Sequence, residues 1–295
     1  MTSFSPHAKG SQDCGGPNMI KEQYSKSTRE SIDRYLNTGD YHPFDSGFPG
    51  TNALEIAKSV GSILRESLLV AIAKSRAQSR FVAAGRVPKN LKSYTRRRVE
   101  PMVTGLFPTV ERRSILQLLQ ASTVFVTDQT MPRIVEYESL GTAWTIANMY
   151  LLSHQAVPLA EDTGSILGMA SETRSYISIE YFAETNPYCS YLVHECAHAF
   201  HNNKRRVVGL PETRKKQWLL PISFRHRETF AYSCEFYSTI VARSKTKADR
   251  LHHLSACRKL SPCPEECVDA AEVDAILEQA VNARNGWKAI LKRCS

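Results

Sequence analysis

The stretch that decides the fold of this 295-residue chain runs from Tyr191 to His201 and reads YLVHECAHAFH. It contains the pattern HExxH, formed by His194, Glu195 and His198. On a helix, residues four apart lie one above the other, so two imidazoles can bind one Zn²⁺ at about 2.0–2.1 Å. Glu195 is then placed to reach a water molecule beside the ion and to act as a general base.

The residues around the pattern indicate a buried helix. Leu192, Val193, Ala199 and Phe200 contribute to a surface that is apolar nearly all round, which is typical of a helix inside a core. Burying two histidines and a glutamate there is costly unless they are paired or bind a metal ion. A chance match to so short a pattern is the alternative, and the buried context favours the metal site.

A catalytic zinc keeps three protein ligands and one open position, so a third ligand is needed. A metzincin would have a glycine at position 201 and a histidine at position 204, whereas this chain has His201 and Lys204. That class is therefore excluded, and a carboxylate from a later helix remains. The segment 225–237, RHRETFAYSCEFY, supplies Glu228 and Glu235.

The polar residues of that segment share one helix face, because Glu228, Tyr232 and Glu235 stand at i, i+4 and i+7. The two glutamates are two turns apart, about 10 Å along the axis at 1.5 Å per residue, so a straight helix cannot bring both to one ion. One carboxylate is expected to bind the metal. The other polar groups are expected to orient the ligating histidines.

The two motifs together resemble the gluzincin metallopeptidases, in which HExxH is followed by Glu-x-Phe-Ala, here beginning at Glu228. Within that group they are most similar to the catalytic domain of anthrax lethal factor and related toxins. The resemblance implies His194, His198 and Glu228 as zinc ligands and Glu195 as the base. The family often has a carboxylate at the position of Tyr232, and its transition-state tyrosine precedes the ligand helix, where this chain has none; Tyr232 is the candidate substitute.

The resemblance covers under a third of the chain and implies an α+β fold. We expect a zincin-like metallopeptidase domain: a small mixed sheet, the HExxH helix and a downstream ligand helix, preceded by a helical N-terminal region. Composition predicts a mostly disordered leader over 1–45, with a short helix near 26–36. The helical region is assigned to 46–115, and the catalytic domain, with a helical tail from residue 247, to 116–295.

Apolar residues at helical spacing predict one or two helices over 51–84, capped by Thr51 or Asn52, and another over 110–119. The segment 89–98 is predicted to be a basic connector. Strands are expected over 122–127 and on either side of a turn at 172–174.

The last strand before the HExxH helix lines the cleft in zincins, where an extended peptide pairs with it through main-chain hydrogen bonds. The candidate for this substrate edge is the segment 175–182, in which Tyr176, Ser178 and Glu180 share one face. An ordinary interior strand is an equally supported alternative.

The chain carries a net charge of +9, with basic clusters at 89–98, 204–206 and 214–216. An acidic partner, such as nucleic acid, anionic lipid or an acidic peptide, is one explanation of these clusters. Solvated loops and helix ends are the other, and it is favoured because no nucleic-acid motif accompanies the charge.

Three of the eight cysteines, Cys189, Cys196 and Cys234, fall in or near apolar helical context and are expected to act as small hydrophobes. Four others could hold a structural zinc or form disulfides: Cys257, Cys263, Cys267 and Cys294. Their spacing departs from the usual CxxC pairs, so reduced cysteines are favoured.

No apolar run approaches the ~20 residues of a membrane span, and the polar N-terminus lacks the apolar core of a signal peptide. A cytoplasmic protein, or an effector secreted without a classical signal peptide, is expected. The sequence predicts a zinc-dependent endopeptidase that cleaves a protein or peptide substrate. The alternative is a catalytically degenerate zincin that binds nucleic acid or protein through its basic clusters.

Overall fold

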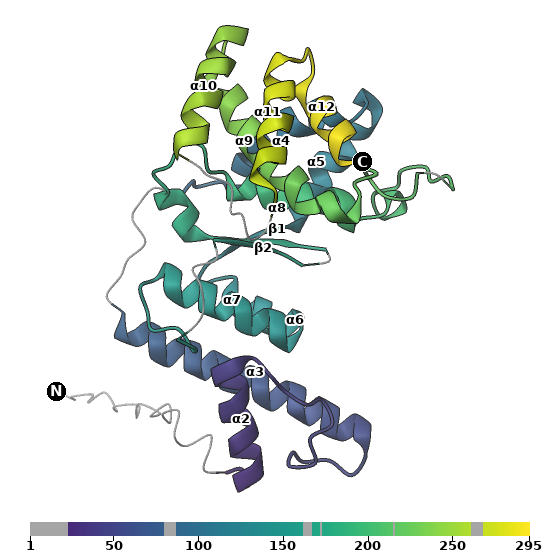
Figure 1. Cartoon of the computed structure of the whole chain (residues 1–295). Coiled ribbons are helices and arrows are strands. Elements are labelled where there is room, and N and C mark those ends of the chain that lie inside the picture. The colour runs from purple at the N-terminus through teal and green to yellow at the C-terminus, as the bar shows by residue number, and fades with distance from the viewer. Residues whose placement is uncertain (1–22, 80–86, 162–166, 172, 215, 261–267) are drawn as a thin grey trace, which may run out of the picture.

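The computed structural model of the chain describes residues 23–79, 87–161, 167–171, 173–214, 216–260 and 268–295. The described part is mostly helical and includes a three-stranded mixed sheet, so the expected α+β class is confirmed. The sheet lies between two groups of helices (Figure 1). None of the described helices combines the length and the apolarity that crossing a bilayer requires.

The sheet consists of β1 (Thr123–Val126), β2 (Gly168–Ala170) and β3 (Ser175–Ser178), in the order β1-β3-β2. Strand β3 pairs in parallel with β1 and antiparallel with β2. Its side chains alternate between two cores, because Ile177 packs in one hydrophobic cluster and Tyr176 in the other. The strands predicted around 122–127 and on either side of the turn at 172–174 are thus observed.

The prediction of a substrate edge at 175–182 is wrong. Strand β3 is hydrogen-bonded on both sides, so the main chain of Tyr176 and Ser178 is already paired. Beyond Ser178 the chain turns into a short 3₁₀-helix, η1 (Ile179–Ala183), which includes Glu180. Among the described strands, β2 is the edge strand that lies next to the HExxH helix. Strand β3 is an ordinary interior strand, which was the alternative interpretation of the segment 175–182.

Four helices above the sheet in Figure 1 share one hydrophobic core: α4 (Leu91–Leu106), α5 (Thr109–Ser122), α8 (Tyr191–Asn202) and α9 (Arg227–Arg243). The predicted helical tail is confirmed for its described residues. It forms α10 (Lys247–Leu260), α11 (Ala270–Asn282) and α12 (Gly286–Cys294), all of which pack against α9.

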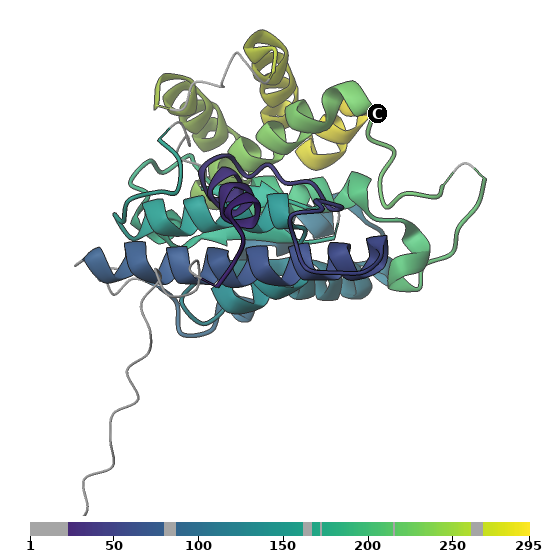
Figure 2. The ribbon, with the colours of Figure 1, turned by 90° about the horizontal axis from the view of Figure 1, so that it is seen from below.

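The second core lies on the opposite side of the sheet. It is formed by α2 (Lys26–Thr38), α3 (Ala53–Gln78), α6 (Met131–Tyr137) and α7 (Leu140–Ser153), which Figure 2 shows from below. Helix α3 begins after Asn52, whose side chain accepts a hydrogen bond from the Glu55 N–H as a helix cap does. The sequence had predicted no helix or strand for the residues that form α6 and α7.

Three N-terminal assignments need correction: the extent of the leader, the basic connector and the domain boundary. The leader assigned to 1–45 includes α2, the expected short helix, whose Ile32 and Tyr35 are fully buried; residues 1–22 lie outside the described part. The basic connector predicted at 89–98 begins helix α4 instead. A domain boundary after residue 115 would cut through α5, which packs in the same core as α8.

The basic clusters are partly used in contacts within the protein. Arg205 is 2% exposed, and its guanidinium donates to the Glu111 carboxylate at 2.6 and 3.3 Å. Lys216 lies 3.6 Å from the same carboxylate, and Arg98 donates to Ser190 Oγ at 2.9 Å. The Arg205 and Arg98 contacts lie within the fold, whereas the Lys216 side chain is 53% exposed.

Among the residues that the structure describes, no disulfide bond joins the cysteines Cys189, Cys196, Cys234, Cys257 and Cys294. Cys196 and Cys234 are fully buried in the core with α8 and α9, in agreement with their predicted role as small hydrophobes. Cys14, Cys263 and Cys267 lie outside the described residues, and so does the centre of the C-terminal cysteine cluster.

Candidate metal centre

Helix α8 carries the HExxH pattern through the interior of the protein. Every residue from Leu192 to His201 is buried, as the apolar sequence predicts. The helix packs on β2 and β3 with one side and on α9 with the other. His194, Glu195 and His198 are 7, 6 and 8% exposed, so the two helices and the edge strand enclose the three polar side chains.

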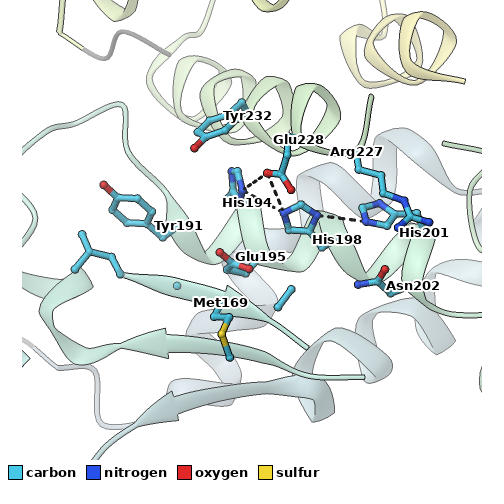
Figure 3. A pocket seen from close by; sticks show the side chains of 13 residues that line it. Met169, Tyr191, His194, Glu195, His198, His201, Asn202, Arg227, Glu228 and Tyr232 are labelled. Carbon is cyan, nitrogen blue, oxygen red and sulfur yellow. Dashed lines mark hydrogen bonds and ion pairs between the residues drawn. The ribbon is translucent and has the colours of Figure 1, made fainter. Parts of the chain in front are cut away.

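The structure brings Glu228 of α9 to the two histidines of α8 (Figure 3). Its Oε2 lies 3.4 Å from Nε2 of His194 and 3.5 Å from Nε2 of His198, and the two Nε2 atoms are 3.2 Å apart. Ligands at about 2.0–2.1 Å from a tetrahedral ion lie about 3.3–3.4 Å from one another. The three atoms therefore have the separations of one face of a tetrahedral metal site, which makes them a candidate ligand set.

The outer nitrogens of both histidines also have partners. Nδ1 of His194 lies 3.2 Å from Oε2 of Glu235, whose Oε1 accepts the Ser190 N–H at 2.6 Å. Nδ1 of His198 lies 3.3 Å from Nε2 of His201. If each Nδ1 carries the proton, both Nε2 lone pairs face Glu228. A metal ion requires this tautomer, because it binds the unprotonated Nε2 atom. The partners Glu235 and His201, on the far side of the rings, fix the tautomer by binding the Nδ1 atoms.

The electrostatics of the cluster favour a positive charge at its centre. Burial opposes the protonation of His194, yet the carboxylates of Glu228 and Glu235 raise its pKa to about 10. The hydrogen bonds from His194 and His198 hold the pKa of Glu228 far below its usual range. In the absence of a metal ion a proton supplies that charge, and a divalent cation is its natural replacement.

Glu195 lies against the edge strand. Burial raises the pKa of its carboxyl, although His194 and His198 lower it. A Cβ atom added at Gly168 would lie 2.8 Å from Cγ of Glu195, so only a glycine lets this carboxylate and β2 approach so closely. The close approach places a proton acceptor between the candidate ligands and the strand.

These residues line a pocket of about 790 Å³. Residues 167–170 form one wall, and Tyr191, Arg227 and Tyr232 form part of the other sides. The ring of Tyr232 stands edge-on to His194, with centroids 4.4 Å apart. Figure 3 shows Tyr191 and Tyr232 near His194 and places His201, Asn202 and Arg227 on the far side of His198.

Of the predicted site residues, the structure gathers all those on α8 and α9: His194, Glu195, His198, Glu228, Tyr232 and Glu235. Sequence reasoning missed the other residues of the pocket, among them Gly168, Tyr191, His201, Asn202 and Arg227. His201 stands three residues after His198 on the same helix, so helix periodicity offered a signal for His201. Arg227 is adjacent to Glu228 in the sequence, and residues one apart do not share a helix face, so periodicity offered no signal for it. Burial, His198 and Arg227 lower the pKa of His201 to about 3, which keeps its ring neutral and able to accept a hydrogen bond.

No protein-family model, curated protein or solved structure matches this chain.

Proposed function

We propose that this protein is a zinc-dependent endopeptidase. One observation carries the proposal: the Nε2 atoms of His194 and His198 and Oε2 of Glu228 lie 3.2–3.5 Å apart, as the ligands of one zinc ion would. The donor set suits the ion, since two imidazoles, one carboxylate and an open fourth position are a known ligand set of catalytic zinc. Glu195 beside them adds the base that peptide hydrolysis needs.

A zinc ion at this place supplies Lewis acidity, which lowers the pKa of a water molecule and polarises a carbonyl group. Glu195 accepts the proton of the attacking water, and its raised pKa makes it a better acceptor than an exposed carboxylate. The same carboxyl then donates that proton to the leaving amine. Tyr232 lines the pocket beside His194 and is the candidate to donate a hydrogen bond to the carbonyl oxygen in the transition state.

An extended peptide is the substrate that the pocket suits best. Among the described strands, β2 (Gly168–Ala170) pairs with β3 alone, so one of its two edges has no neighbouring strand. Its residues line the pocket beside Glu195. Its other edge can pair with a peptide main chain. The substrate strand is therefore assigned to β2 in place of the segment that contains Tyr176, Ser178 and Glu180.

The alternative of a degenerate zincin that binds nucleic acid has less support. A candidate base and three candidate ligands lie together at the pocket, and the cationic residues Arg205 and Lys216 contact Glu111. A salt-dependent shift of DNA or RNA that survives Glu195→Gln would favour that alternative.

Metal analysis of purified variants tests the proposal. The wild-type chain should hold about one zinc ion at this site, and His194→Ala should lose it. Glu195→Gln should keep the zinc and the fold but lose hydrolysis of peptide libraries, because an amide cannot accept the proton. His252→Ala, which changes an exposed histidine of α10, is the matched control. Unchanged zinc in His194→Ala, or near-normal turnover in Glu195→Gln, would overturn the proposal.

A further inference from the structure

One end of the pocket has hydrogen-bond donors that the metal centre does not use. Beyond His198, the lining continues with His201, Asn202 and Arg227 (Figure 3). His201 belongs to α8 and Arg227 is the first residue of α9. The two helices that carry the candidate ligands therefore also form this end of the pocket.

His201 presents an N–H group that has no partner in the described part of the chain. If His198 keeps its Nε2 lone pair for the metal, its Nδ1–H donates to Nε2 of His201 at 3.3 Å. The proton of the neutral His201 ring is then on Nδ1. That atom is buried and has no hydrogen-bond partner among the residues that the structure describes, although His201 is only 5% exposed. A buried donor left unpaired is destabilising, so an acceptor at this place would be favourable.

Arg227 adds a positive charge, which has no carboxylate partner among the residues that the structure describes. Its Nε–H is buried without a hydrogen-bond partner, and no carboxylate of the described residues forms an ion pair with it. The adjacent Glu228 points to His194 and His198 instead. The guanidinium lies over the ring of Phe224, 4.6 Å from its centroid, which holds it at the pocket without neutralising it.

The donors and the charge fit a carboxylate better than a neutral carbonyl group. A guanidinium binds a carboxylate through two parallel N–H···O bonds, and such charge-assisted bonds are about twice as strong as neutral ones.

We propose that His201, Asn202 and Arg227 form a carboxylate-binding subsite, through which the enzyme selects peptides with an acidic side chain or a free C-terminal carboxylate close to the cleaved bond. This inference rests on the proposed endopeptidase function and names its substrate class. A side-chain carboxylate and a terminal carboxylate share the same chemistry, and the probes below separate them.

Three dipeptides that carry a succinyl hydroxamate on the N-terminal amine, and that differ only in charge, test the subsite by calorimetric binding to the zinc-loaded protein. One has a glutamate side chain and an amidated C-terminus, the second a glutamine side chain and a free C-terminus, and the third is the neutral glutamine amide. One of the two anionic probes, or both, should bind about 10- to 100-fold more tightly than the neutral one. The stronger of the two identifies the source of the carboxylate.

Variants of Arg227 show whether the preference arises at this place. Arg227→Gln should remove the preference while the neutral probe still binds, and Arg227→Lys should keep part of it, because an ammonium retains the charge but not the paired N–H groups. Arg225→Gln is the matched control, since Arg225 is exposed and does not line the pocket; it should bind all three probes as the wild type does.

The outcomes separate the two proposals. Equal affinities for all three probes, or a preference that survives Arg227→Gln, would overturn the carboxylate subsite and leave the endopeptidase proposal intact. A chain that binds neither zinc nor any hydroxamate would overturn the metal centre and the subsite with it.

Discussion

Gly168 and Glu195 lie so close together that a Cβ atom added to the glycine would be 2.8 Å from Cγ and 2.9 Å from Oε1 of the glutamate. Gly168 belongs to the edge strand β2, and Glu195 is the proposed base on α8. The missing side chain therefore lets the carboxylate lie between the strand that would hold a peptide and the residues that would hold the metal.

Gly168→Ala should displace Glu195 or push β2 away from α8. We expect peptide hydrolysis to fall by about 100-fold, because a misplacement of about 1 Å at a reacting group has a cost of that order. Zinc content should stay unchanged, since the three candidate ligands are not in the path of the new methyl group. Gly141→Ala is the control, because nothing lies within 4 Å of a Cβ atom there. Equal activity of both variants would show that this approach does not position the base.

The affinity for zinc should depend on pH through His194. In the metal-free protein its pKa is raised from 6.5 to about 10, so the imidazole is protonated at pH 7–9 and zinc must displace that proton. Affinity should therefore rise about tenfold per pH unit over this range. Zinc titrations against a chelating competitor at three pH values measure the slope, and calorimetry in two buffers measures the released proton. A flat profile would contradict the assignment of His194 as a ligand.

The two glutamates of α9 should differ sharply in their effect on zinc. Oε2 of Glu228 faces the Nε2 atoms of both histidines, whereas Oε2 of Glu235 lies at Nδ1 of His194. Glu228→Ala should lower zinc affinity severely because a ligand is lost. Glu235→Ala should cost about 10- to 100-fold, as expected for a group that orients a ligand. Glu66→Ala, at an exposed position of α3, is the control, and the reverse order of losses would transfer the ligand role to Glu235.

The candidate ligands could be predicted from the sequence because each motif is local. The spacing of His194 and His198 fixes their common face on a helix, and the same holds for Glu228 and Glu235 on α9. Residue spacing within each helix cannot predict how α8 and α9 pack together. Their packing brings Glu228 to Nε2 and Glu235 to Nδ1 of His194. The zinc ion itself stays a prediction.

The strand order and helix α4 could not be predicted for physical reasons. The sequence of a strand does not show which strands lie beside it. The interior position of β3 results from its pairing with β1, whose residues are distant in the sequence, so local patterns could not predict it. The basic residues alone suggested a connector over 89–98. Helix α4 also contains Pro101, and proline in a helix interior usually destabilises the helix. Burial of Val99, Met102 and Leu106 on one face, together with the Asn90 cap, outweighs that cost.

The buried pair of Glu111 and Arg205 should control the stability of the core around α5. Glu111→Gln leaves the guanidinium of Arg205, which is 2% exposed, without a countercharge. Removing one partner of a buried ion pair costs about 3–5 kcal/mol, and denaturant unfolding of the two proteins measures the loss. The control is Glu100→Gln, whose pair with Arg96 is about half exposed, with side-chain exposures of 56 and 49%; it should cost less than about 1 kcal/mol.

The same pair should make the fold sensitive to acid. The Arg205 hydrogen bond holds the pKa of Glu111 below its usual 4.5, although burial raises it. A carboxyl group whose pKa is lower in the folded than in the unfolded protein stabilises the fold. This stabilisation is complete at a pH above the pKa of the unfolded state, and it is lost as the pH falls through the pKa of the folded state. The free energy of unfolding of the wild type should therefore decrease below about pH 4.5 more steeply than that of Glu111→Gln. Parallel profiles of the two proteins would show that Glu111 is not linked to the acid transition.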